Sequence, residues 1–114
     1  MPEISPADAK QLIDSGAQLI DVRTDAEYEA GHIPGSQHVP LTDLRPDAGG
    51  LEREQAVVIY CRSGDRSGLA ADAFAASGWD AHSITGGLEA WQEEGFPLEP
   101  ADGTVAHTPG LPPP

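Results

Sequence analysis

The sequence predicts an α/β fold in which a mainly parallel central sheet carries helices on both faces. Candidate strands alternate with candidate helices along the chain, which is the order from which parallel sheets are built. Residues 56–60 (AVVIY) form a continuous apolar run rich in β-branched side chains, as expected of a central strand that is covered on both faces. The length of 114 residues suits one domain that buries its own core.

The first predicted element is a helix that begins after Ser5. Ser5 is a suitable N-cap, Pro6 suits the first helical position, and Gly16 ends the helix. Three apolar side chains then share one face of this helix: Ala9, Leu12 and Ile13. The following segment, residues 18–22, is too short for an independent helix and is predicted to be a strand.

A second helix of about two turns is predicted by a capping box. Thr24 is the cap, Glu27 is its partner three residues later, and Gly31 closes the helix. Glycine and proline breaks then surround a short extended piece at residues 37–39, and a helical turn is expected from Thr42.

A polar loop, residues 45–55, leads to the apolar strand at residues 56–60. An Ala-rich helix is predicted from Ser67 to Ser77, where Gly78 ends it. Its apolar side chains are expected along one side: Leu69, Ala70, Ala73 and Phe74.

The last predicted elements are a strand at residues 82–84, a tight turn at 86–87 and a helix at 88–94. Two side chains of that helix are expected to point inward: Leu88 and Trp91. Residues 1–99 are therefore expected to form one domain. Residues 100–114 lack periodicity and end in prolines, which predicts a Pro-rich flexible tail.

The charge of the chain disfavours several classes of partner. Six Lys and Arg against nineteen Asp and Glu give a formal net charge of -13. Such a chain repels the phosphate backbone of nucleic acids and the surface of anionic membranes. The N-terminal residues lack the basic start and apolar run of a signal peptide, and no apolar stretch approaches the length of a membrane span. We therefore expect a cytoplasmic protein.

The histidines and the cysteine do not have the spacing of metal ligands. The chain has one cysteine, Cys61, which excludes an internal disulfide. The four histidines are scattered along the chain: His32, His38, His82 and His107. No metal or organic cofactor is expected.

The cysteine lies in a short segment, residues 60–68 (YCRSGDRSG), that also holds two of the six basic residues. Cys61 follows the buried strand directly, and a helix is predicted after it, so this exposed loop should lie at the carboxyl edge of the sheet. Open α/β sheets bind ligands at that edge. Small residues in the loop allow successive backbone N–H groups to turn inward and form an anion cradle: Ser63, Gly64 and Gly68.

The charges around Cys61 favour a reactive thiol. Arg62 and Arg66 supply fixed positive charge, which Asp65 cancels in part. Positive charge and a helix N-terminus stabilise the thiolate, which is the nucleophilic form of cysteine. The alternative is a buried, inert cysteine that acts as a small hydrophobic residue.

Three segments in order resemble the rhodanese (sulfurtransferase) family, specifically its single-domain members. They are LIDVRTDAEYEAGHIPGSQHVPL (19–41), VVIYCRSGDRS (57–67) and GGLEAWQEEGFPL (86–98). The resemblance implies a rhodanese-like fold with its active loop at a strand-to-helix turn. The agreement of all three segments is a more specific signal than any one of them.

The resemblance also implies a mechanism, in which Cys61 takes the outer sulfur of a small anionic donor such as thiosulfate and becomes a persulfide. Cyanide, an external thiol or a protein acceptor then removes that sulfur, and no cofactor takes part. Six residues are implied in substrate binding: Arg62, Ser63, Gly64, Asp65, Arg66 and Ser67.

Other positions in the matching segments are expected to serve structure. Asp21 and Arg23 should pair and brace the edge of the sheet near the loop, while Glu27 and His32 should fix the turn that follows. Trp91 is expected in the core or in a pocket wall.

Two other functions are compatible with a reactive cysteine in such a loop. A cysteine phosphatase or arsenate reductase is disfavoured by spacing, because the phosphatase pattern has His before the cysteine and Arg six positions after it. Here Tyr60 precedes Cys61, Arg66 is the fifth residue after it, and Ser67 is the sixth. The other function is a sulfur-carrier or binding module with little thiosulfate turnover. With no second cysteine, the acceptor of the sulfur must in either case be external.

Overall fold

In the computed structural model, which describes residues 3–40, 43–44, 52 and 54–99, five parallel strands form one sheet. The elements follow one another as β1 (Glu3–Ile4), α1 (Pro6–Asp14), β2 (Gln18–Asp21), α2 (Asp25–Ala30), β3 (Gln37–His38), β4 (Val57–Tyr60), α3 (Asp65–Ala76), β5 (Ala81–Ile84) and α4 (Gly87–Glu93). The strand order is β1-β5-β4-β2-β3, so β4 is the central strand. The predicted α/β class is confirmed.

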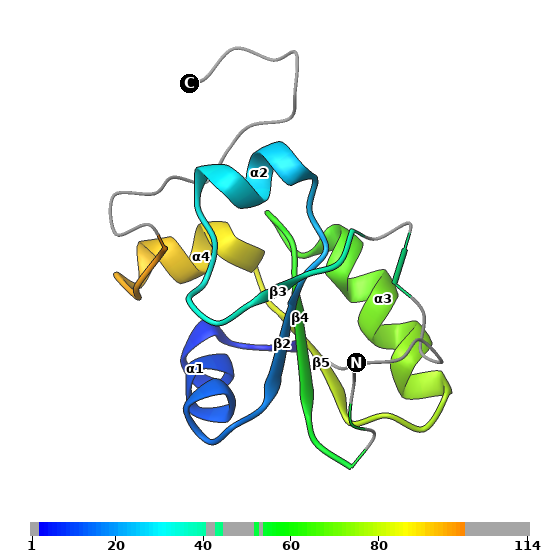
Figure 1. Cartoon of the computed structure of the whole chain (residues 1–114). Helices are drawn as coiled ribbons and strands as arrows, with labels where there is room; N and C mark the ends of the chain where they lie inside the picture. The colour runs from blue at the N-terminus through cyan, green and yellow to red at the C-terminus, as the bar shows by residue number, and fades with distance from the viewer. Residues whose placement is uncertain (1–2, 41–42, 45–51, 53, 100–114) are drawn as a thin grey trace.

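Helices cover both faces of the sheet because the side chains of β4 alternate between two cores. Val57, Ile59 and Cys61 belong to one apolar cluster, to which α3 contributes Phe74. Val58 and Tyr60 belong to a second cluster on the opposite face. That cluster includes side chains from α1 and α4: Ala9, Leu88 and Trp91. Figure 1 shows α3 on one side of the sheet, α1 and α4 on the other, and α2 across the end of the sheet.

The caps predicted for the first two helices are present. The Ser5 side chain accepts a hydrogen bond from the backbone N–H of Asp8 at 3.1 Å, and Pro6 is the first residue of α1. At α2, the Thr24 side chain accepts from the N–H of Glu27, while the Glu27 carboxylate accepts from the N–H of Thr24 at 3.1 Å. Both helices therefore begin where local hydrogen bonding satisfies their free N–H groups.

Helix α3 differs from its prediction at its start. It begins at Asp65 rather than at Ser67, because Gly64 takes a left-handed conformation (φ 106°) at the N-cap and lets the helix start inside the loop. The face of α3 that packs against the sheet also differs from the predicted face. Leu69 is 70% exposed and Ala73 is exposed, so their predicted inward direction is wrong. The residues that face the sheet are Ser67, Ala70, Ala71 and Phe74. An Ala-rich helix has small apolar residues on several sides, which leaves the direction of its packed face undetermined by pattern alone.

The remaining elements agree with their predictions to within one or two residues, apart from β1. That two-residue edge strand pairs with β5 and carries no periodic signal in the sequence. The helical turn expected from Thr42 and the tail at residues 100–114 lie outside the described residues, as does most of the predicted loop at 45–55. Among the residues that the structure describes, no helix is long and apolar enough to cross a membrane.

The observed packing of α3 predicts different effects for two substitutions of apolar residues in that helix. Phe74→Ala removes a side chain that is 1% exposed and should lower the free energy of unfolding by about 3–5 kcal/mol. Leu69→Ala removes an exposed side chain and should change it by less than about 0.5 kcal/mol. Urea unfolding of both variants measures the difference, and equal losses would show that Leu69 faces the core.

Candidate active site

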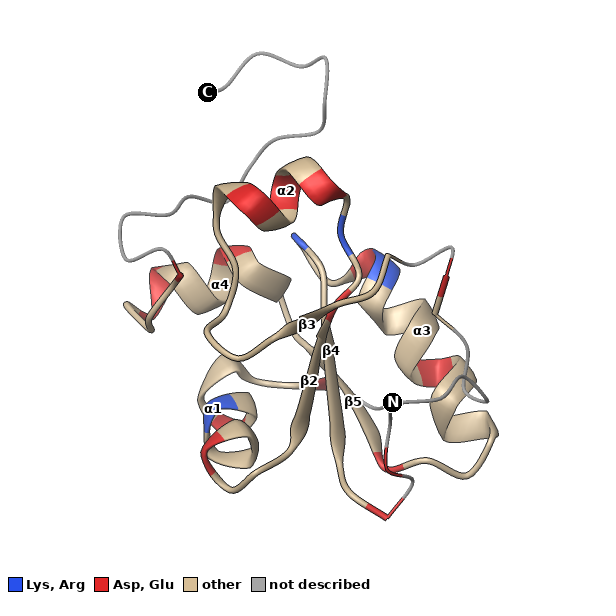
Figure 2. Cartoon of the chain, in the orientation of Figure 1, with Lys and Arg blue, Asp and Glu red and all other residues tan. Residues whose placement is uncertain are grey.

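Cys61 lies directly after β4, and the loop that follows it runs only to Gly64 before α3 begins. This is the carboxyl end of the parallel strands, where ligands bind in open α/β sheets. Basic segments gather at the same end of the sheet, beneath the acidic helix α2 (Figure 2). The loop therefore lies at the sheet edge expected from the sequence.

The sulfur of Cys61 is surrounded by hydrogen-bond donors. The backbone N–H of Gly64 donates to Sγ at 3.1 Å, the N–H of Ser67 at 3.4 Å, and the Ser67 hydroxyl at 3.5 Å. Cys61 is only 1% exposed, so the expectation of an exposed loop is wrong for this residue. Strand β4 sends its side chain into the α3 side of the core. The sulfur is nevertheless in a polar setting, because N–H and O–H dipoles directed at one atom favour negative charge on it.

A second serine supports this arrangement from the neighbouring strand. Ser83 of β5 and Ser67 of α3 are both fully buried, and their hydroxyl oxygens are 2.8 Å apart. The Ser67 hydroxyl is also 3.4 Å from the Gly64 carbonyl, so it links the loop to the sheet. Ser83 could not be identified from the sequence, since a lone serine in a short strand carries no signal for such a contact.

The amino end of α4 holds the other side of the loop. The N–H of Leu88 donates to the Cys61 carbonyl at 2.8 Å, and the N–H of Glu89 donates to the Arg62 carbonyl at 3.1 Å. A Cβ on Gly87 would lie 2.5 Å from the Cys61 oxygen and 2.6 Å from the Arg62 oxygen. Only glycine permits this approach, in which both carbonyls accept hydrogen bonds from the amino end of α4.

Arg62 of the loop and Arg66 of the first turn of α3 bind acidic side chains from other elements. Arg66 makes two parallel hydrogen bonds to the carboxylate of Glu27 in α2, at 3.0 and 3.1 Å. Arg62 Nε lies 3.3 Å from a carboxylate oxygen of Glu89 in α4. Glu27 was predicted to cap α2 and to fix the turn after it, but this residue also contacts Arg66 of α3. The two partners are 39 residues apart, a separation at which no local pattern predicts a contact.

The Glu27 and Arg66 groups stabilise each other's charge. Burial raises the pKa of Glu27, but hydrogen bonds from Arg66 and Thr24 and the charge of Arg66 outweigh burial, and the net pKa is lowered from 4.5. The pKa of Arg66 is raised, chiefly by its hydrogen bonds to Glu27 and against the effect of burial, with smaller contributions from the charges of Glu27, Cys61 and Asp21. Glu27 is 3% exposed and Arg66 is 35% exposed, so the carboxylate is shielded from solvent while the guanidinium is still partly screened by it.

Asp21 and Arg23 form the ion pair predicted from the sequence. Both side chains are fully buried, and Arg23 donates to the Asp21 carboxylate through Nε and Nη2, the latter at 2.8 Å. Arg23 also donates to the carbonyl of Gly31 at the end of α2. The pair therefore ties β2 to the end of α2 and braces the sheet edge beside the cysteine loop.

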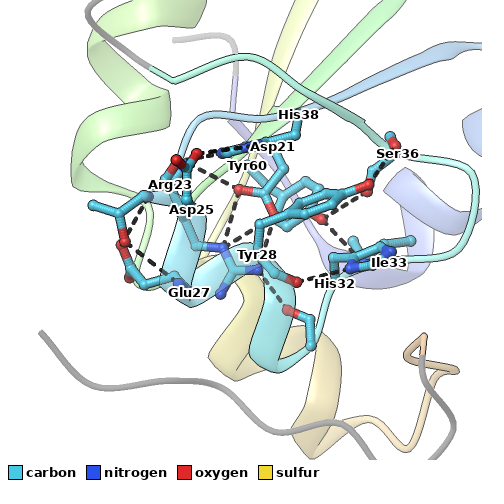
Figure 3. Close-up of polar contacts among 12 residues, drawn as sticks. Asp21, Arg23, Asp25, Glu27, Tyr28, His32, Ile33, Ser36, His38 and Tyr60 are labelled. Atoms are coloured by element: carbon cyan, nitrogen blue, oxygen red, sulfur yellow. Dashed lines mark hydrogen bonds and ion pairs between the residues drawn. The ribbon is translucent and has the colours of Figure 1, made fainter. Parts of the chain in front are cut away.

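Tyr60 adds a further connection at this edge, visible in Figure 3 beside Asp21 and Arg23. Its hydroxyl accepts from the N–H of Ile33 at 3.0 Å and donates to Ser36 at 3.1 Å. Burial and the nearby charge of Asp21 raise the pKa of Tyr60 above its ordinary value, so it remains a neutral donor.

The turn after α2 is held by an aromatic stack. The ring of Tyr28 stacks on His32 with centroids 3.9 Å apart and on His38 with centroids 4.5 Å apart (Figure 3). His32 Nδ1 is 2.8 Å from the Tyr28 carbonyl. His32 thus has the turn-fixing place expected for it. Within the described parts of the chain, no group of three His, Cys, Asp or Glu side chains is arranged to hold a metal ion.

Comparison with known proteins gives one family and several relatives. The family described as "Rhodanese-like domain" matches residues 5–94. Thiosulfate sulfurtransferase GlpE of Pseudomonas paraeruginosa is 34% identical over 100 residues, which are 87% of this chain and 87% of that protein. The putative sulfur carrier protein YrkF of Bacillus subtilis is 44% identical over 73 residues, or 62% of this chain and 40% of that one. The crystal structure of a rhodanese-related protein from Thermoplasma volcanium is 31% identical, with a TM-score of 0.78 over 86% of this chain and 97% of that chain.

The close contact between Gly87 and the loop predicts an asymmetry between two glycines. Gly95→Ala introduces a left-handed alanine (φ 77°) with nothing within 4 Å of its Cβ, and should cost about 1–2 kcal/mol. Gly87→Ala adds a backbone collision and should cost more. NMR should also show the Gly64 and Ser67 amide resonances moving in the Gly87 variant alone. Equal effects of both variants would mean that α4 does not hold the loop.

The lowered pKa of Glu27 predicts how stability depends on pH. The unfolded chain binds this proton near 4.5 and the folded chain only at lower pH, so Glu27 stabilises the fold above 4.5 and loses that effect as pH falls further. Urea unfolding of the wild type and Glu27→Gln between pH 7 and 3 should give a difference that is constant above about pH 5 and shrinks below it. A difference in unfolding free energy that stays constant down to pH 3 would contradict the lowered pKa of Glu27.

Proposed function

Since the chain belongs to the rhodanese-like family, whose relatives include sulfurtransferases, we propose that it moves a sulfane sulfur through a persulfide on Cys61. The donor is thiosulfate or a related small anion, and the acceptor is cyanide or a thiol. One observation carries the proposal: the amides of Gly64 and Ser67 and the Ser67 hydroxyl all point at Sγ of Cys61. The proposed compartment is the cytoplasm.

In the first half-reaction the Cys61 thiolate attacks the outer sulfur of the donor. A bond forms between Sγ and that sulfur, the S–S bond of thiosulfate breaks, and its electron pair leaves with sulfite. The charge of the thiolate passes to the terminal sulfur of the persulfide. The N–H and O–H groups that stabilise the thiolate are therefore placed to stabilise the persulfide as well. No separate general base is needed once the thiol is ionised.

In the second half-reaction an external nucleophile removes the outer sulfur. Cyanide leaves as thiocyanate, or a thiolate leaves as a new persulfide, and the Cys61 thiolate is restored. Cys61 is the only cysteine of the chain, so no internal thiol can resolve the persulfide. The cycle thus requires two separate substrates that use the same site in turn.

The remaining roles belong to residues 62–67. We propose that the backbone from Arg62 to Ser67 surrounds the persulfide, including the positions of Ser63 and Asp65, and that the two arginines orient the anionic donor. Arg66 is 35% exposed and is therefore accessible to a donor while it contacts Glu27.

A second candidate function is a sulfur carrier that receives and delivers sulfur with little thiosulfate turnover. The likeness to the putative sulfur carrier YrkF favours it, as does the fact that each loop arginine already binds a carboxylate. Delivery to a protein then replaces delivery to cyanide. A phosphatase is disfavoured because Arg66 points to Glu27 and the loop lacks the spacing of that class. Robust Cys61-dependent hydrolysis of a chromogenic phosphate ester would overturn the sulfur assignment.

We predict that Cys61→Ser abolishes sulfur loading. The purified wild type, incubated with thiosulfate and freed of excess, should gain the mass of one sulfur atom, which cyanide or a reductant removes. The serine variant should gain none, because its hydroxyl is a poor nucleophile toward sulfane sulfur. Thermal unfolding serves as the control, since the substitution is small. Sulfur loading by a folded serine variant would refute the assigned nucleophile.

The two candidate functions predict different acceptors. For a sulfurtransferase of small molecules, the loaded protein should transfer its sulfur to cyanide, which forms thiocyanate, at least as fast as it transfers sulfur to a protein thiol. For a carrier, transfer to a reduced thiol protein such as thioredoxin should be much faster. Single-turnover mixing of pre-loaded protein with each acceptor, followed by intact mass, measures both rates.

A further inference from the structure

The contact between Glu27 and Arg66 places a carboxylate beside the proposed sulfur site. Arg66 is the residue next to Ser67, whose N–H and hydroxyl contact the Cys61 sulfur. The two hydrogen bonds at 3.0 and 3.1 Å fix the guanidinium in a bidentate contact. Glu27 is therefore coupled to the site through Arg66 rather than through any contact with the sulfur.

The carboxylate is held in this position from both sides. Its Oε1 atom also accepts from the N–H and the hydroxyl of Thr24, both at 3.1 Å, so the same group caps α2 and binds Arg66. Arg62 has a comparable acidic neighbour in Glu89. A donor that arrives at the loop thus meets guanidinium groups whose charge is already countered.

Resting on the proposed function, we infer that Glu27 sets the charge selectivity of this site and disfavours a dianionic sulfur donor relative to a less charged one. A dianion must share Arg66 with the carboxylate, and each additional negative charge on the donor raises the electrostatic cost of approach. A donor with one charge meets less of that cost. Glu27 acts as a specificity-determining residue and not as a catalytic residue.

Two small donors isolate this effect because they carry the same reacting group. Thiosulfate carries two negative charges, and methanethiosulfonate carries one because a methyl group replaces an oxygen. In both reactions Sγ bonds to the outer sulfur and the S–S bond breaks. The electron pair leaves with sulfite in the first case and with methanesulfinate in the second. The donors differ in charge and in one substituent at the leaving group.

The test compares the ratio of kcat/KM for thiosulfate to kcat/KM for methanethiosulfonate, with cyanide as acceptor. Glu27→Gln removes the charge and keeps the oxygen that caps α2, because glutamine also serves in a capping box. We expect this substitution to raise the ratio by about tenfold. The change should lie mainly in KM for thiosulfate, because the interaction concerns binding of the donor.

Two control variants separate charge from damage to the fold. Glu29→Gln removes an exposed acid from the same helix and should leave the ratio unchanged. Glu27→Asp keeps the charge but shortens the side chain, so it disturbs the capping box and should leave the ratio close to that of the wild type. Thermal unfolding of each variant reports how much stability was lost.

The outcomes decide the proposal. An unchanged ratio in a folded Glu27→Gln variant would overturn it, and so would an equal rise in Glu27→Asp or Glu29→Gln. If Glu27→Gln fails to fold, a ratio in Glu27→Asp that departs from the wild type by severalfold would also overturn it. The proposed function fails separately, and earlier, if neither donor adds a sulfur atom to the wild-type protein by intact mass.

Discussion

The site depends on the backbone contact between the amino end of α4 and the cysteine loop. The N–H groups of Leu88 and Glu89 bind the carbonyls of Cys61 and Arg62, and Gly87 is the residue that permits the approach. With those carbonyls turned to α4, the loop can direct its own N–H groups at the sulfur. The hydrogen-bond donors around the sulfur are thus positioned mainly by the backbone, and the side-chain charges act on an arrangement that the main chain provides.

Charge at the site is distributed among elements that are distant in the sequence. Arg66 binds Glu27 of α2 and Arg62 binds Glu89 of α4, as the salt bridges show. Asp21 and Arg23 neutralise each other nearby. Each buried charge therefore has a partner, as a low-dielectric interior requires. This pairing connects α2 and α4 to the segment around Cys61. In a chain with a net charge of -13, the arginines near the thiol are thus already paired with carboxylates.

The fold and the place of the site could be predicted because their signals are local. The capping box at Thr24 and the apolar run of β4 each act within a few residues, and a cysteine between a strand and a helix must lie at the sheet edge. Contacts between distant residues could not be predicted. Glu27 meets Arg66 and Ser67 meets Ser83 only after the sheet has formed, and no spacing reports such contacts. The face of α3 that packs against the sheet could not be predicted either. Small side chains on several sides allow the helix to pack in more than one rotation about its axis.

The depth of Cys61 has a consequence for what can react with it. A sulfur atom with 1% of its residue exposed is shielded from bulky electrophiles and from casual collisions with oxidants. A small reactant, or the narrow end of a larger one, is less affected by this shielding. Burial therefore limits by size which molecules reach Sγ, and it slows unwanted oxidation of the only thiol of the chain.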